Sequence, residues 1–136
     1  MKRLLALALL AGYSLVVAQL TLRDPEHGRW AFSFADRLAT SASSGRLSWD
    51  RTEVLANVAL FVPYGFLLRI LLGRAWAAVL LCVLISAGIE LAQQAYLPTR
   101  VPTVADVEHN ALGGLLGALL ASLLTTFGRA GSPGRA

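Results

Sequence analysis

The sequence predicts an all-α, polytopic membrane protein, a bundle of four transmembrane helices with a long outer loop between the first and the second. Hydrophobic residues make up 56% of the 136 residues, whereas soluble domains have about 45–50% even when glycine is counted. Only 15% of the residues are charged, against about 25% in soluble domains, and the mean hydropathy is +0.61. Four apolar runs are each close to the roughly 20 residues that a helix needs to cross a bilayer.

The four apolar runs place the expected helices along the chain. They cover residues 4–22, 54–72, 75–97 and 111–127. We expect the last helix to begin near Asp106, because Asp106 and Glu108 in a first turn favour the positive end of the helix dipole. The predicted spans are therefore 4–22, 54–72, 75–97 and 106–127, within a single membrane domain over residues 1–128. The Gly- and Pro-containing segment 129–136 is expected to be a disordered tail.

The first run has an alternative interpretation as a cleaved signal peptide. Lys2 and Arg3 precede its apolar core, and residues 16–18 resemble a small-residue cleavage site. A signal core is usually about 7–15 residues long, so the length of this run favours a retained helix.

Basic residues near the span ends predict the orientation. Four spans leave six Lys and Arg residues on each side. On one side they lie in short segments without acidic residues, whereas on the other most are spread along the loop 23–53. Since positive residues in short segments mark the cytoplasmic side, we expect a multi-pass protein of the bacterial cytoplasmic membrane with both termini in the cytoplasm. The pattern of residues 29–41 also predicts a short helix, which would either lie on the outer leaflet or cap the bundle.

Polar residues inside the second and third spans are the first candidates for function. Asn57 lies about one turn inside the outer end of the second span. Ser86, Glu90 and Gln94 recur every four residues and predict a polar stripe on one face of the third. Seven residues separate Glu90 from the outer end of that span, which puts its carboxylate roughly 10 Å deep at about 1.5 Å per residue. An ionisable residue at such depth is costly unless it is paired or functional.

The fourth span carries a second polar face, and small residues follow the polar ones along the helix. Asp106 and Asn110 follow one another at helical spacing. Four residues are expected to shape helix packing, through a kink at the proline and close backbone approach at the glycines: Pro63, Gly65, Gly113 and Gly117.

Hairpin topology brings six polar residues to the outer end of the bundle. They are Asn57, Glu90, Gln94, Arg100, Asp106 and Asn110. We predict that they form a binding pocket, in which Arg100 attracts an anionic headgroup while Glu90 and Asp106 accept hydrogen bonds. The simpler alternatives are interhelical hydrogen bonds, worth about 0.6 kcal/mol each, and an ion pair between Glu90 and Arg100.

Other classes of site find no support in the sequence. His109 with Asp106 and Glu108 does not bring three metal ligands to one helix face, and the single cysteine, Cys82, excludes an internal disulfide. Nucleotide-binding and hydrolase motifs are missing. We therefore expect no metal, no cofactor and no nucleic-acid partner.

Three linked motifs resemble the VanZ-like family of bacterial integral membrane proteins. They read Asn57-x3-Phe61-x-Pro63-x-Gly65-Phe66, Ser86-x3-Glu90-x3-Gln94 and Arg100-x5-Asp106-x3-Asn110-x2-Gly113-x3-Gly117, and the resemblance covers about residues 52–124. Residues 107–109 depart from the apolar pattern expected there. The namesake of the family is associated with low-level resistance to the glycopeptide teicoplanin. The resemblance thus implies a small helical protein acting on the cell envelope.

These observations favour a non-enzymatic envelope protein. Its partners would be membrane lipids, a lipid-linked cell-wall precursor or an envelope protein. Two alternatives remain open: an intramembrane enzyme with Glu90 or Asp106 as general base, and a small transporter component that would need an oligomer to form a path.

Overall fold

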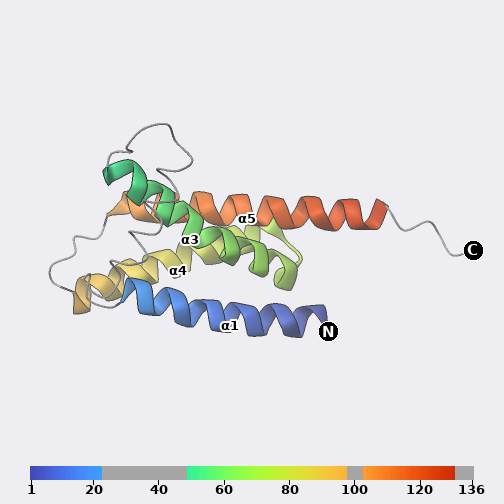
Figure 1. Ribbon diagram of the computed structural model, residues 1–136, viewed down its shortest axis with the longest axis horizontal. Helices are drawn as coiled ribbons and strands as arrows, with labels where there is room; N and C mark the ends of the chain where they lie inside the picture. Colours follow the sequence, from blue (N-terminus) through green and yellow to red (C-terminus); the bar gives the residue numbers. More distant parts are fainter. Residues whose placement is uncertain (23–48, 98–102, 131–136) are drawn as a thin grey trace, which may run out of the picture.

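A computed structural model describes residues 1–22, 49–97 and 103–130 of the chain. These residues form four helices: α1 (Lys2–Thr21), α3 (Trp49–Leu72), α4 (Ala75–Tyr96) and α5 (Val104–Ala130) (Figure 1). All four are long and apolar enough to cross a membrane, and no strand occurs in the described ranges. The predicted all-helical fold with four candidate spans is confirmed. The helix expected at 29–41 lies outside the described residues.

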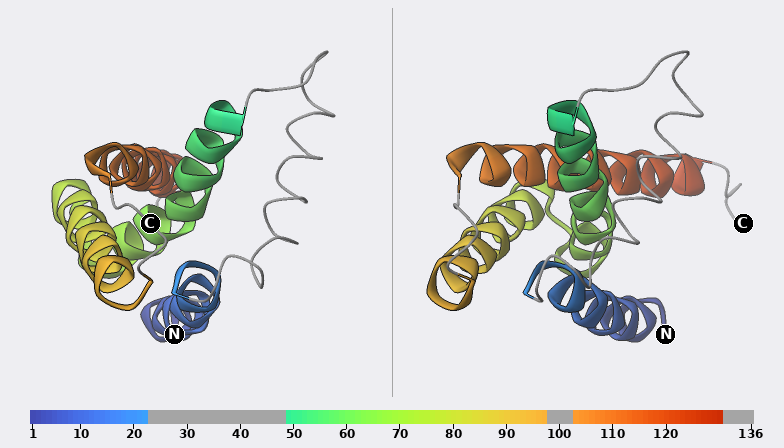
Figure 2. Two further views of the ribbon diagram at one scale, coloured as in Figure 1. Left: turned by 90° about the vertical axis from the view of Figure 1, so that its left-hand side faces the viewer. Right: turned by 60° about the vertical axis from the view of Figure 1, so that its left-hand side comes forward.

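The helices alternate in direction along the bundle. α1 and α4 end where α3 and α5 begin (Figure 1), and we call this the pocket end. The start of α1 and the end of α5 are both at the opposite end. Seen from the pocket end, α3 and α4 lie between α1 and α5 (Figure 2). Residues from the starts of α3 and α5 therefore meet residues from the ends of α1 and α4.

Glycines allow α3 and α5 to pack backbone against backbone. A Cβ atom at Gly113 would collide with the Val58 carbonyl, and one at Gly117 with the Val62 carbonyl and, at 2.7 Å, with the Phe66 amide nitrogen. These glycines are one helical turn apart, so both stand on the same face of α5. This contact is the most extensive in the bundle.

A second group of small residues completes the contact of α5 with α3 and α4. A Cβ atom at Gly65 would collide with the Gly114 backbone, and one at Gly114 would lie 2.7 Å from Cβ and Sγ of Cys82. Cys82 itself is fully buried and forms no disulfide. It serves as a small apolar packing residue, as its place within a span predicts.

At the end opposite the pocket, a tight turn joins α3 to α4. Gly73 follows the last residue of α3 with a φ of 71°, and its N–H donates to the Arg69 carbonyl at 3.0 Å. This left-handed conformation ends a helix at little cost only when the residue is glycine. One turn earlier, Arg69 Nε donates to Ser122 Oγ at 2.9 Å and ties α3 to α5.

Two tyrosines attach α1 to α3. The Tyr13 hydroxyl donates to the Leu60 carbonyl at 2.7 Å, and the Tyr64 hydroxyl donates to Ser14 Oγ at 3.1 Å. Their rings meet edge to face, with centroids 5.2 Å apart. Pro63 lies inside α3, and because proline lacks an N–H it weakens the helical hydrogen bonding of the preceding turn. The carbonyl that loses its helical donor is that of Ala59, and the donor from α1 goes to the next carbonyl in that turn, Leu60.

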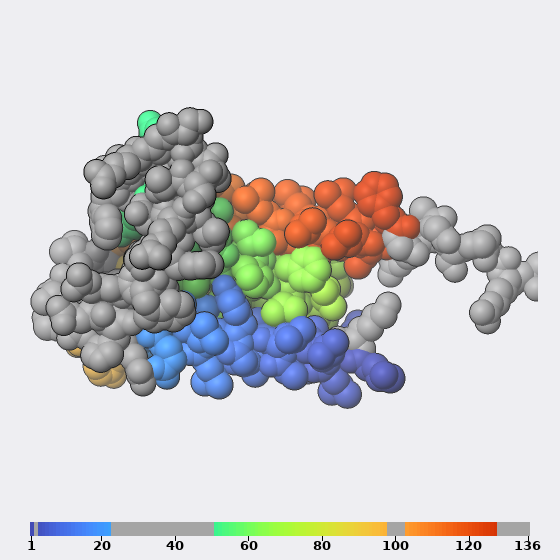
Figure 3. Space-filling model, in the orientation of Figure 1, coloured from blue at the N-terminus to red at the C-terminus, as the bar shows by residue number. Residues whose placement is uncertain are grey.

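The outward faces of the helices are apolar. On α4, Leu80, Leu84 and Leu91 are all more than half exposed. Figure 3 shows α3 between α1 and α5 on one side of the bundle, where all three helices present their outer side chains. An apolar exterior around a core that contains buried Ser and Asn side chains is the arrangement expected in lipid.

Three helices extend beyond the predicted spans, and α1 does so by two residues at its start, Lys2. α3 starts at Trp49 rather than at 54, and α5 runs to Ala130, two residues into the segment expected to be a tail. With 27 residues at about 1.5 Å each, α5 is about 40 Å long, more than the roughly 30 Å of the hydrocarbon core. Helices continue into water when their residues favour it, so the apolar run marks the span and not the helix ends.

Candidate functional site

A polar pocket lies at the pocket end, between the ends of all four helices. Its volume is about 50 Å³, and it is lined by Thr21, Glu53, Asn57, Leu60, Phe61, Ile89, Glu90, Gln93, Asp106 and Asn110. By the same measure one water molecule needs about 10–15 Å³. The pocket therefore has room for a few waters or for one small polar group.

Asp106 joins the starts of α3 and α5. Its Oδ1 accepts a hydrogen bond from Asn57 Nδ2 at 2.7 Å, and its Oδ2 accepts one from the Thr103 hydroxyl at 2.7 Å. The Asp106 N–H donates in return to Thr103 Oγ at 3.2 Å. This reciprocal pair caps the N-terminus of α5 in the manner of a capping box. Both carboxylate oxygens thus accept hydrogen bonds from neighbouring side chains. Through these bonds Asp106 fixes the position of Asn57 relative to the start of α5.

Asn110 forms the inner part of the pocket wall. It is only 5% exposed, and its Nδ2 donates to Ser86 Oγ at 2.8 Å, which links α5 to α4. Its Oδ1 is buried and has no hydrogen-bond partner within the described part of the chain. Because buried polar atoms are normally hydrogen-bonded, this oxygen marks a place where a donor is needed.

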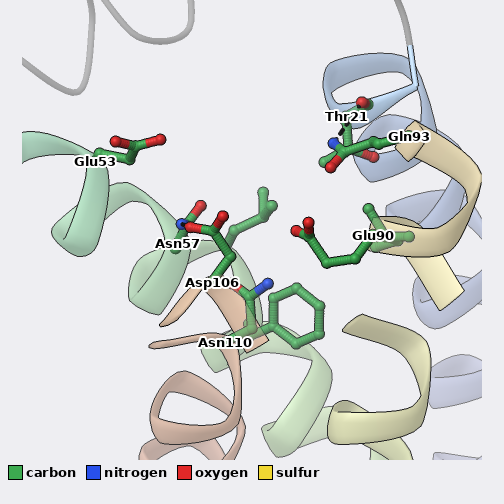
Figure 4. Close-up of a pocket in the computed structure, with 10 residues that line it drawn as sticks. Thr21, Glu53, Asn57, Glu90, Gln93, Asp106 and Asn110 are labelled. Carbon is green, nitrogen blue, oxygen red and sulfur yellow. Dashed lines mark hydrogen bonds between the residues drawn. The ribbon is translucent and has the colours of Figure 1, made fainter. Parts of the chain in front are cut away.

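Glu90 reaches into the pocket from α4. Its carboxylate points toward Asp106, on the opposite wall, whereas Glu53 lies farther out along α3 (Figure 4). Six residues separate Glu90 from the end of α4, which corresponds to about 9 Å of helix. Two carboxylates that face each other repel unless a proton, a cation or donor groups lie between them.

The structure places the predicted site residues unequally. Asn57, Glu90, Asp106 and Asn110 all line the pocket. Gln94, in contrast, is exposed on α4 and does not line it. Arg100 lies outside the described residues, so its expected role stays a prediction.

Gln93 takes the place expected for Gln94. It is 3% exposed, and its Nε2 donates to the Thr21 carbonyl at 2.8 Å, which closes the end of α1 onto α4. A helix turns by 100° per residue, so two steps of four residues drift 80° from the starting face, whereas seven residues return to within 20° of it. Gln93, seven residues after Ser86, therefore lies on the same face of α4 as Ser86, whereas Gln94 does not.

Glu53 and Thr21 were not predicted. Glu53 precedes Asn57 by four residues, so extension of the second helix beyond its apolar run would have indicated it. Thr21 accepts the Gln93 hydrogen bond through its backbone carbonyl, and no side-chain pattern reports such a contact.

The Gln93 contact predicts a local effect on α1. In Gln93→Ala, the last turn of α1 loses its hydrogen bond to α4, worth about 1 kcal/mol. We expect amide hydrogen exchange in that turn to become about fivefold faster, measured by mass spectrometry of the protein in detergent. Gln94→Ala, which changes the exposed neighbour, should leave the exchange unchanged. Equal exchange in the two variants would contradict the role of Gln93.

The chemistry of the pocket is that of an acceptor-rich site. It is lined by three carboxylates, and none of its described lining residues is basic. Among the described residues, no group of three or more His, Cys, Asp or Glu side chains is arranged so that it could hold a metal ion. The arrangement suits hydrogen-bond donors and positive charge.

Comparison with known proteins identifies a family. No match was found among curated proteins or among solved structures. The family model described as VanZ/LLP1 matches residues 4–125, most of the chain, and agrees with the resemblance carried by the three motifs. The chain belongs to the VanZ/LLP1 family.

Proposed function

We propose that this protein is a non-enzymatic component of the bacterial cell envelope, whose pocket binds the headgroup of a lipid or of a lipid-linked cell-wall precursor. One observation carries the proposal: a polar pocket with three carboxylates lies at one end of a bundle whose outward faces are apolar. A polar group attached to a membrane anchor could enter such a pocket without leaving the bilayer surface.

The distribution of basic residues supports an outer position for the pocket. Lys2 and Arg3 lie at the start of α1, and Arg74 lies in the α3–α4 turn, so all three are at the end opposite the pocket. Positive residues beside spans favour the cytoplasm. The proposal therefore places the pocket at the outer face of the cytoplasmic membrane, with both termini in the cytoplasm.

Binding is favoured over catalysis by the state of Asp106. Both of its carboxylate oxygens accept hydrogen bonds from the protein, which leaves it poorly placed to take a proton from a substrate.

A link to glycopeptide resistance is suggested only by membership of the family. A pocket of about 50 Å³ is far too small for a whole glycopeptide, so any such link would act through a small polar group.

The test is native mass spectrometry of the purified protein. We expect a lipid to co-purify with the wild type and to be lost in Glu90→Ala, because this variant removes the carboxylate that reaches into the pocket from α4. Gln94→Ala changes a polar residue one turn along α4 but outside the pocket, and should retain the lipid. Identical lipid content in all three proteins, with equal melting temperatures, would overturn the proposal.

A further inference from the structure

The hydrogen-bonding groups of the pocket are unbalanced. Glu53, Glu90 and Asp106 line it with carboxylates, while its described lining contains no Lys, Arg or His. The Asn57 amide donates to Asp106, and Gln93 donates to the Thr21 carbonyl. At least one N–H of each of these amides is thus used within the protein, and the lining combines three acidic side chains with no described basic one.

Asn110 supplies an independent sign of a missing donor. The residue is only 5% exposed, and its amide nitrogen donates one hydrogen bond to Ser86 Oγ. Its Oδ1 has no partner among the residues described. Since Asn110 lines the pocket beside Glu90 and Asp106 (Figure 4), a donor placed there would satisfy this oxygen and stand near the facing carboxylates.

We propose that the group held in this pocket is a primary ammonium, with N–H donors directed at Asn110 Oδ1 and at the Glu90 carboxylate. This inference rests on the proposed function and names its ligand class. An ammonium group has three donors, no acceptor and a positive charge, which matches acceptor-rich walls. A charge-assisted hydrogen bond to a carboxylate is also stronger than a neutral one.

Other ligand classes fit less well. An anionic headgroup would meet carboxylates without a described cation in the lining. A quaternary ammonium has no N–H donor and is usually held by a cage of aromatic rings, whereas Phe61 is the single aromatic residue of the described lining. A volume of about 50 Å³ accommodates a group a few water molecules in size, such as the amine end of a headgroup.

A primary ammonium could belong to an aminophospholipid or to a soluble amine. Both present the same chemistry to Glu90 and Asn110. The position of the pocket near the end of the apolar bundle makes a lipid the better source, and the experiment includes both.

The experiment compares three lipids that share the same acyl chains. Delipidated protein in detergent is titrated with dioleoyl phosphatidylethanolamine, phosphatidylcholine and phosphatidylglycerol, and bound lipid is counted by native mass spectrometry. We expect phosphatidylethanolamine to bind about tenfold or more tightly than the other two, the effect of one hydrogen bond to a charged group. Glu90→Gln should remove this preference, while Gln94→Ala should keep it.

Soluble amines identify the source of the ammonium. Displacement of bound lipid by ethanolamine, but not by choline, would show that the ammonium alone is sufficient. Binding of phosphatidylethanolamine that ethanolamine does not displace would show that the lipid anchor is required. Either result supports the inference, provided that Glu90→Gln abolishes the preference.

Three results would overturn the inference. These are equal affinity for phosphatidylethanolamine and phosphatidylcholine, tighter binding of phosphatidylglycerol, and a phosphatidylethanolamine preference that persists in Glu90→Gln. If lipid binding shows no preference for an amine but still requires Glu90, the proposed headgroup binding is supported and the assignment of a primary ammonium is wrong. If no lipid binding depends on Glu90, both proposals fail.

Discussion

Gly117→Ala is expected to lower the free energy of unfolding by about 2–3 kcal/mol, because overpacking a closely packed contact has costs of this size. The added Cβ would collide with the Val62 carbonyl and the Phe66 amide nitrogen. Both obstacles are backbone atoms of α3, which cannot rotate away as a flexible side chain would. The two helices would have to separate along their most extensive contact. Reversible unfolding in mixed micelles measures the change.

Gly88→Ala provides the matched control. Gly88 also lies within a span, on α4, and a Cβ atom there would have nothing within 4 Å. Alanine in a helix is favoured over glycine by up to about 1 kcal/mol, so this variant should be neutral or slightly more stable. Equal stability of the two variants would show that α3 and α5 do not pack backbone to backbone.

Asp106→Ala is expected to destabilise the protein by about 2–3 kcal/mol, because it removes a hydrogen bond to a charged group and a helix cap. The carboxylate holds both Asn57 on α3 and Thr103 at the start of α5. A double-mutant cycle with Asn57→Ala isolates the first contact. We expect a coupling energy of about 1–2 kcal/mol, between the values typical of neutral interhelical bonds and of charged ones.

Glu108→Ala is the control for the loss of an acidic residue. Glu108 lies two residues further along α5 and is exposed, so its removal should change stability by less than about 0.5 kcal/mol. A coupling energy near zero between Asn57 and Asp106 would mean that the bond contributes nothing to the bundle.

The spans could be predicted from the sequence because hydrophobicity alone selects them. Each of the four apolar runs is contained in one of the helices α1, α3, α4 and α5, and none extends more than one residue beyond its helix. The hairpin order places Asn57, Glu90, Asp106 and Asn110 at one end. Because consecutive spans run in opposite directions, the end of one span lies at the same side of the bundle as the start of the next. Most of the predicted pocket lining follows from these two facts.

Details of the pocket depend on information that the spans do not carry. The difference between Gln93 and Gln94 depends on the rotation of α4 about its axis, which is set by packing against its neighbours. The first turns of α3, which carry Glu53, are polar and escape a search for apolar runs. The part played by Thr21 is a backbone contact, and every residue has the same carbonyl.

The way in which α1 is attached has a consequence for sequence drift. Of the hydrogen bonds that join it to the bundle, two end on backbone carbonyls, those of Leu60 and Thr21. A carbonyl survives substitution of its own side chain, so these two hydrogen bonds depend on Tyr13 and Gln93 as donors and not on which side chains stand at positions 60 and 21. The bond between Tyr64 and Ser14 joins two side chains, so a change at either position alters the selective pressure on the other.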